Sequence, residues 1–302
     1  MAETDEVEHT LLTVRDWLRY ATSRFTQAGL AYGHGTASAL DEAAYLILHT
    51  LHLPIDQLDP WLDARLLLGE RKALEAIVAK RIATRKPAPY LTNEAWVQGH
   101  AFYVDERVIV PRSYIGELMA GGLEGVVEDP DSVERVLDLC TGSGCLAVLA
   151  ALQFPGASVD ASDVSADALA VAERNVATYG LGERIELVRS DLFAGLLERT
   201  YDLILSNPPY VSAEAVAAFP PEYAAEPVLA HAGGEDGLDL VRRILAEAGT
   251  HLTPDGTLVV EIGTGRDILQ AEFPRLPFLW LDTAESEGEV FALNAKDLKK
   301  GR

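Results

Sequence analysis

The sequence predicts an α/β fold: a parallel sheet with helices on both faces, preceded by a smaller helical domain. After about residue 113, short strand-like runs alternate with helical patterns, as successive βαβ units require. Before residue 93, apolar residues recur every three to four positions, which is typical of amphipathic helices. A chain of 302 residues is long enough to hold two such domains.

Residues 1–92 are expected to form three or four helices, separated at Pro54, Pro60 and the glycines of 29–35. The third of these carries a mildly basic run, made of Arg65, Arg71, Lys72, Lys80, Arg81, Arg85 and Lys86. It is interpreted as a solvated helix face or, alternatively, as a contact surface for RNA or a partner. Residues 93–112 are expected to link the domains through a β-hairpin that pairs 101–104 with 108–110.

Residues 113–302 form the second expected domain. Strands are predicted at 133–140, 157–163, 183–190, 201–206, 256–263, 277–282 and 288–295. Helices are predicted at 145–153, 165–180 and 237–252. Open α/β sheets bind their ligands at the carboxyl ends of the strands, so the residues that end each strand are the candidate site.

Charge and cysteine usage exclude several classes of function. The formal charge is −22, from 25 basic and 47 acidic side chains, and the acidic excess lies mostly after residue 95. Duplex DNA requires clustered cations, so no direct DNA binding is expected, whereas a basic protein partner suits this charge. Cys140 and Cys145 are interpreted as core residues, and no metal site is predicted. An acidic start without a signal-peptide pattern, and no apolar run of 18 residues, predict a cytoplasmic protein without membrane spans.

The first strand runs into the motif TGSGC at 141–145. Gly142 and Gly144 allow a tight turn and a close approach of the backbone to a ligand. The third glycine of a dinucleotide fingerprint is absent, because Ala147 stands at its position, and no phosphate-loop lysine follows. The motif therefore favours a nucleotide-like ligand without a pyrophosphate. Asp138, inside the strand, is a candidate acceptor for the amides of this loop.

Acidic residues end the next two strands. Asp163 is placed to accept both hydroxyls of a ribose, and it is preferred over Asp167, which falls in the first turn of the following helix. Asp191 is placed to accept from an exocyclic amine, while Leu192 offers a backbone N–H and an apolar wall.

The fourth strand ends in the motif NPPY at 207–210. Pro208 and Pro209 have no backbone N–H, so the Asn207 side-chain oxygen and the Pro208 carbonyl remain as acceptors beside the Tyr210 ring. Two acceptors beside an aromatic wall match a planar NH₂ group, either an amide or an aromatic amine.

Together these motifs resemble a class I S-adenosylmethionine-dependent methyltransferase, which implies a Rossmann-like, mostly parallel seven-stranded sheet. Nearly the whole chain is similar to the protein-(glutamine-N5) methyltransferases. The segments YGHGT at 32–36, YLTNEAW at 90–96 and GHAFYVDERVIVPRS at 99–113 favour the PrmB branch, which modifies large-subunit ribosomal protein three. Tyr114 departs from that branch, which more often has proline there. The segment 226–239 is similar to both this branch and the PrmC (HemK) branch, which modifies release factors.

The resemblance implies S-adenosylmethionine as cofactor and a glutamine of that ribosomal protein as acceptor, met free or in an assembling ribosomal particle. The residues implied at the cofactor are Thr141, Gly142, Ser143, Gly144, Cys145, Asp163, Asp191, Leu192 and Asn207. Those implied at the glutamine are Asn207, Pro208, Pro209 and Tyr210. Arg112 is expected to help close the pocket or to form a plain salt bridge. The helical domain is expected to recognise the protein substrate.

Other functions remain as alternatives. Release-factor methylation would keep the mechanism, and a nucleic-acid amino methyltransferase would use the same acceptor geometry but needs basic contacts and a flipped base. A non-catalytic cofactor-binding or ribosome-assembly module would not require the NPPY acceptors. A dehydrogenase is disfavoured by the missing glycine.

Overall fold

The computed structural model describes residue 7 and residues 9–300 and divides into two units. The first unit runs through Glu94 and also includes the separate segment Phe219–Ala225, while the second comprises Ala95–Ala218 and the chain from Glu226 onward. The acidic start that argued against a leader lies at 1–9, mostly outside the described residues. The three-part division expected from the sequence stays a prediction.

The first unit is helical. Its helices are α2 (Val14–Gln27), α3 (Ala39–Thr50), α4 (Leu68–Thr84) and α5 (Ala88–Thr92). Helix α2 begins at a capping box, because the Thr13 hydroxyl accepts the Asp16 N–H and the Asp16 carboxylate accepts the Thr13 N–H. Its buried face carries Val14, Trp17 and Phe25, so the three-to-four spacing buries one side of the helix in the core of this unit.

The basic run at the third predicted helix is not a uniform solvated face. Arg81, on α4, is fully buried, and Arg85 at its C-terminal end is partly buried. Both guanidiniums are held by carboxylates of the same unit, so they are not available to RNA or to another protein. A helix of mixed composition can turn a charged side chain inward when that charge is paired there.

A two-stranded sheet joins β1 (Glu94–Val97) to β2 (His100–Tyr103). The hairpin therefore lies upstream of the predicted pairing of 101–104 with 108–110, which is wrong. Gln98 and Gly99 both have positive φ, as a tight two-residue hairpin turn requires. The chain does turn at 105–107, although no hairpin forms there. This turn is stabilised by the Asp105 carboxylate, which accepts hydrogen bonds from the Arg107 N–H and the Arg107 guanidinium.

Within the described residues, seven strands form the sheet of the second unit. In spatial order they are β5 (Ile185–Arg189), β4 (Ser158–Asp163), β3 (Arg135–Leu139), β6 (Tyr201–Ser206), β7 (Leu252–Glu261), β9 (Val290–Asn294) and β8 (Leu279–Leu281). Among these described strands, β9 is antiparallel to both of its neighbours, β7 and β8, and the other pairings are parallel. The predicted α/β fold with a mostly parallel sheet is confirmed. The chain order reverses between β3 and β6, and that switch point is where open sheets bind ligands.

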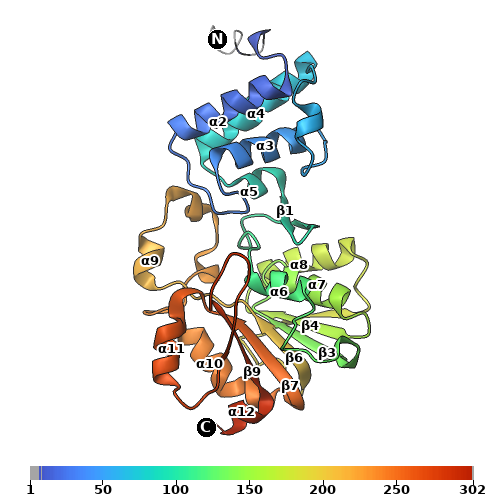
Figure 1. The fold of residues 1–302 in the computed structure, drawn as a ribbon, viewed down its shortest axis with the longest axis vertical. Coiled ribbons are helices and arrows are strands. Elements are labelled where there is room, and N and C mark those ends of the chain that lie inside the picture. Colours follow the sequence, from blue (N-terminus) through green and yellow to red (C-terminus); the bar gives the residue numbers. More distant parts are fainter. Residues whose placement is uncertain (1–6, 8, 301–302) are drawn as a thin grey trace. The chain divides into compact units, whose positions relative to one another are not determined.

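Helices cover both faces of this sheet (Figure 1). One face packs against α6 (Tyr114–Ala120), α7 (Cys145–Gln153) and α8 (Ala166–Thr178). The other packs against α10 (Asp239–Glu247), α11 (Arg266–Glu272) and α12 (Ala295–Lys300). Shorter elements are α9 (Ala213–Ala217) and the 3₁₀ turns Asp59–Trp61, Pro130–Ser132, Pro221–Ala225, Val228–Ala230, Ala248–Thr250 and Gly263–Gly265. Two apolar layers thus hold the sheet rigid beneath its loops.

Candidate active site

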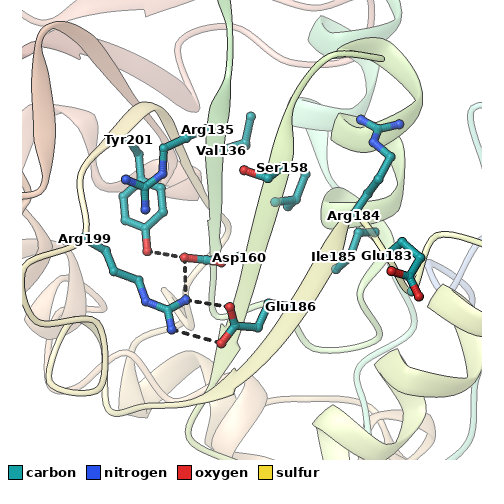
Figure 2. Close-up of a pocket in the computed structure, with 12 residues that line it drawn as sticks. Arg135, Val136, Ser158, Asp160, Glu183, Arg184, Ile185, Glu186, Arg199 and Tyr201 are labelled. Atoms are coloured by element: carbon teal, nitrogen blue, oxygen red, sulfur yellow. Dashed lines mark hydrogen bonds and ion pairs between the residues drawn. The ribbon is translucent and has the colours of Figure 1, made fainter.

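One hollow of about 540 Å³ lies at the amino ends of β3, β4, β5 and β6 (Figure 2). The Arg199 guanidinium lies 2.9 Å from carboxylate oxygens of both Asp160 and Glu186. The Tyr201 hydroxyl donates to Asp160 at 2.7 Å. The one guanidinium offsets part of the charge of the two carboxylates and links the amino ends of β4, β5 and β6. The candidate site lies at the opposite, carboxyl ends of the strands.

That second pocket, of about 570 Å³, lies where β3, β4, β5 and β6 end. Several residues singled out from the sequence line it: Gly142, Asp163, Asp191, Leu192, Asn207 and Pro209. Its lining does not include the other members of the two motifs, Thr141, Ser143, Gly144, Cys145, Pro208 and Tyr210. Residues 107–109 and 227–234 complete its walls, so the linker and the loop after the acceptor motif both reach the pocket.

The loop after β3 is fixed from below by Asp138. One of its carboxylate oxygens accepts the Thr141 hydroxyl and the Ala147 N–H, the latter at 2.9 Å. Asp138 is fully buried, and burial raises the pKa of its carboxyl group to about 7. Asp138 therefore shapes the loop from the core and does not line the pocket.

Gly142 and Gly144 serve different purposes. Both have positive φ, but a Cβ on Gly142 would meet nothing within 4 Å, so this position stays open on the pocket side. A Cβ on Gly144 would lie 3.0 Å from the Cβ of Ala172 on α8. Both glycines were expected to let the backbone approach a ligand, whereas Gly144 permits close packing of the loop against α8.

Asp163 ends β4 with its carboxylate held by two backbone groups. One oxygen accepts the Gly142 N–H and the other accepts the Ser165 N–H, each at 2.9 Å. Burial raises the pKa of the Asp163 carboxyl, while these hydrogen bonds act in the opposite direction. Each oxygen keeps a further lone pair, so a carboxylate oriented in this way can accept two adjacent hydroxyls. Asp167 is exposed on the first turn of α8.

Asp191 and Leu192 follow β5. The Asp191 carboxylate lies 2.9 Å from the Arg243 guanidinium of α10, and both side chains are exposed. Leu192 is buried and has φ +48°, a conformation fixed in part by the Ser190 hydroxyl, which donates to its carbonyl. Arg243, which the sequence argument did not single out, therefore holds the carboxylate at the rim of the pocket.

Asn207 lies at the end of β6 with its amide oriented by the linker. Its Nδ2 donates to the carbonyl oxygen of Arg112 at 3.2 Å. A carbonyl partner identifies this atom as the amide nitrogen, because an oxygen there would face another acceptor. The Oδ1 atom consequently lies on the other side of the amide, and Asn207 lines the pocket.

Tyr210 is clamped from two sides. Its hydroxyl donates to Glu261 Oε1 at 3.0 Å, and its ring packs against Gly263, where a Cβ would come within 2.8 Å. Glu261 Oε2 accepts the Ser113 hydroxyl at 2.7 Å and the Tyr114 N–H at 3.0 Å. Burial raises the pKa of Glu261 to about 7 and also raises that of Tyr210. One buried carboxylate thus joins the acceptor motif to the start of α6.

Arg112 forms a salt bridge. Its guanidinium makes a bidentate pair with Glu226, with distances of 3.0 and 2.9 Å. Glu226 also accepts the Val110 N–H at 2.9 Å and lies 2.9 Å from His231 Nε2. The side chain of Arg112 therefore ties the linker to the loop after the acceptor motif, while its carbonyl orients Asn207.

Sequence reasoning missed Glu261, Glu226 and Arg243. Glu261 could have been found by the rule that identified Asp163, because it is the polar residue at the carboxyl end of a predicted strand. Glu226 and Arg243 carry no such signal, since a charged residue in a loop or on a helix is usually solvated.

Comparison with known proteins decides the family. The model of the methyltransferase small domain matches residues 124–219. Ribosomal protein uL3 glutamine methyltransferase of Burkholderia pseudomallei is 57% identical over 95% of each chain. Enzymes of that name from Bradyrhizobium diazoefficiens and Neisseria gonorrhoeae are 56% and 54% identical, over 95% and 97% of this chain and 92% and 98% of theirs. This chain belongs to the uL3 glutamine methyltransferase family.

Membership of the uL3 glutamine methyltransferase family makes the chain an enzyme and S-adenosylmethionine its methyl donor. Among the described residues, no helix is both long and apolar enough to cross a bilayer.

Proposed function

We propose that this chain transfers a methyl group from S-adenosylmethionine to the side-chain amide nitrogen of a glutamine in ribosomal protein uL3. The names of its relatives support the substrate. The observation that carries the chemistry is the hydrogen bond from Asn207 Nδ2 to the Arg112 carbonyl, which leaves Oδ1 as an acceptor beside the pocket. Because ribosomal proteins are made and assembled in the cytoplasm, the proposal places the enzyme there.

The pocket residues fit an adenosyl group. S-adenosylmethionine, when bound, supplies an electrophilic methyl group on its sulfonium. Asp163 would accept the ribose hydroxyls, using the lone pairs that its backbone donors leave. Gly142 would let the backbone approach, with the rest of 141–145 shaping that turn. Asp191 would accept the exocyclic amine, and Leu192 would cover the base.

The acceptor motif would hold the glutamine. An amide nitrogen is a poor nucleophile, because its lone pair is delocalised, so orientation and charge stabilisation have to supply the rate. Asn207 Oδ1 and the Pro208 carbonyl would each accept one N–H of the glutamine and favour the positive charge that develops on its nitrogen as the methyl group leaves the sulfonium sulfur. One N–H proton would then be lost to water, which restores a neutral amide. Pro208 and Pro209 present no competing N–H. Since Glu261 takes the Tyr210 hydroxyl, the tyrosine would contribute its ring alone.

The three-part division completes the proposal. The helical domain at 1–92 would recognise uL3, the linker at 93–112 would contribute the Arg112 carbonyl, and 113–302 would carry out the transfer. The acidic excess after residue 95 supports a basic protein partner, whether free or in an assembling ribosomal particle.

Labelled S-adenosylmethionine, offered with uL3, a release factor and DNA in parallel, tests this function, with the methyl group located by mass spectrometry. We expect label on a glutamine of uL3, and Asn207→Ala to lower kcat by about 10²–10³. Asn294→Ala is the control, because Asn294 ends the antiparallel strand β9 at the opposite edge of the sheet and pairs there with Asp297 of α12. Label on the release factor or on DNA would overturn the assignment of uL3 as the substrate. A loss of kcat below tenfold in Asn207→Ala would overturn the role of Asn207.

A further inference from the structure

The chain that follows the acceptor motif belongs in part to the first unit. Tyr210 and Ala218 lie in the second unit, Phe219–Ala225 is part of the first, and Glu226 is again part of the second. The segment Phe219–Ala225 includes a 3₁₀ turn, Pro221–Ala225. The loop that would border the bound glutamine is therefore continuous with a segment that packs among the helices of the first unit.

The carboxylate of Glu222 is fully buried in the first unit. Its Oε1 atom accepts the Arg85 guanidinium at 2.7 Å and the Ala31 N–H at 3.0 Å, and it lies 3.8 Å from Arg81 Nη1. Burying a carboxylate is costly unless it is paired and hydrogen-bonded. Oε1 of Glu222 is both, whereas Oε2 has no hydrogen-bond partner among the described residues.

Arg81 connects Glu222 to a second buried carboxylate. Its Nε donates to Glu42 Oε1 at 2.6 Å and its Nη2 donates to the Ala31 carbonyl at 3.1 Å. Glu42 Oε2 accepts the Thr36 hydroxyl at 3.1 Å. Two guanidiniums thus balance two carboxylates. Apolar residues would stabilise a core as well or better. Buried ion pairs therefore suggest that the segment Phe219–Ala225 has to be held in one particular position.

A slot for an aromatic ring lies beside these charges. The Tyr223 ring packs against two other rings. The distance between ring centroids is 4.3 Å to His34 and 4.3 Å to Phe219. Gly33 has φ +114°, and a Cβ there would lie 3.4 Å from the Tyr223 hydroxyl. The Gly33 N–H donates to the Thr36 carbonyl at 2.9 Å, which closes the loop 32–36 into a tight turn. Gly33 and His34 of the YGHGT motif therefore border the Tyr223 side chain.

We propose that the YGHGT motif together with Glu42, Arg81 and Arg85 forms a built-in cradle whose ligand is the protein's own Glu222–Tyr223, and that Glu222 is a positioning residue for the glutamine-binding loop. We call this group the Glu222 cradle. The inference rests on the proposed function, because it takes residues 207–210 as the site that holds the glutamine.

The physical effect is to order the loop before substrate arrives. Within the second unit, the clamp holds Tyr210 and Arg112 holds Glu226; within the first unit, the cradle holds Glu222. A loop already ordered costs less to immobilise on binding than a loose one. The cradle should therefore act mainly on the KM for the protein substrate, and not on the cofactor or the chemical step.

The test uses the full-length chain with purified uL3 and compares Glu222→Gln with Glu214→Gln. Glu214 is exposed on α9 in the same loop, so it loses the same charge without touching the cradle. We expect Glu222→Gln to raise the KM for uL3 by about tenfold, with kcat and the Kd for S-adenosylmethionine within about twofold. Hydrogen exchange should accelerate in residues 211–225, and Glu214→Gln should match the wild type in every measurement.

Tyr223→Ala provides a second variant, because it empties the ring slot without leaving a buried charge unpaired. If Glu222→Gln unfolds the first unit, Tyr223→Ala is still expected to raise the KM for uL3 and to accelerate hydrogen exchange in residues 211–225. An unchanged KM with unchanged exchange in both variants would overturn the cradle. If the wild type methylates no glutamine of uL3, the proposed function fails, and the exchange measurement still decides separately whether the cradle holds the loop.

Discussion

The Tyr210 hydroxyl donates a 3.0 Å hydrogen bond to Glu261, a buried carboxylate that also accepts the hydroxyl of Ser113 and the N–H of Tyr114. The acceptor motif, the end of β7 and the start of α6 therefore meet at one side chain. The orientation of the motif depends on this carboxylate as well as on the rigidity of its two prolines.

Replacing Tyr210 by Phe should test the clamp. The ring keeps its packing against Gly263, but Glu261 Oε1 loses its donor, and an unsatisfied buried acceptor costs about 1–3 kcal/mol. The free energy of unfolding in urea should fall by that amount, and kcat should fall with it. A variant with wild-type stability would show that the hydrogen bond contributes nothing net.

Stability should depend on pH through Glu261 and Asp138, since burial raises the pKa of each to about 7. The native state then holds protons that the unfolded chain has already released. The contribution of these two groups to the free energy of unfolding should therefore be largest below about pH 4 and fall as the pH rises to about 7, by on the order of 3 kcal/mol for Glu261. Urea unfolding at pH 5 and pH 8 would measure this loss.

Glu261→Gln supplies the control for that experiment. The amide does not titrate, so the variant should lose less stability than the wild type between the two pH values. An equal loss in both proteins would assign the pH dependence to other groups.

Asp163→Asn should weaken the binding of S-adenosylmethionine by about ten- to a hundredfold. The variant keeps one acceptor oxygen but loses the charge, and its NH₂ group would face either the Gly142 or the Ser165 N–H. Asp167→Asn, four residues on and exposed, removes the same charge outside the pocket. Calorimetric titration with the cofactor should separate the two variants; equal affinities would refute the assignment to Asp163.

The two glycines of the loop after β3 should respond oppositely to alanine. Gly144→Ala places a methyl group 3.0 Å from Ala172, so we expect a loss of about 1–3 kcal/mol of stability. Gly142→Ala meets no neighbour and should destabilise less, while its methyl group projects into open space beside the cofactor pocket and weakens binding. Unfolding curves and cofactor titrations of both variants give the comparison; the reverse pattern would contradict it.

The sequence was informative wherever one local rule applied. Alternating periodicity predicted the sheet, and the rule for strand ends brought Asp163, Asp191 and Asn207 to one edge. The same rule, applied to β7, would have added Glu261. Contacts distant in sequence had no such signal: a glutamate in a loop says nothing of an arginine on a helix 141 positions earlier, and so the pairing of Glu222 with Arg81 could be seen only in the fold.

The hairpin shows a second kind of failure. Both the true turn at Gln98–Gly99 and the predicted one at 105–107 contain residues that favour turns, and strand pairing decides between them. Propensity alone ranks such alternatives poorly, because cross-strand contacts set the register.

The division of the first unit between 7–94 and Phe219–Ala225 limits how its parts can be exchanged among relatives. A chimera joined at residue 94 would take Glu42, Arg81 and Arg85 from one parent and Glu222 from the other. The buried ion pairs would then form between residues of two different parents. A fragment ending at residue 94 would likewise keep the pair of Arg81 with Glu42 but leave Arg85 without the Glu222 carboxylate. Grafting the helical domain onto another member of the family therefore requires two insertions, with the segment 219–225 transferred alongside it.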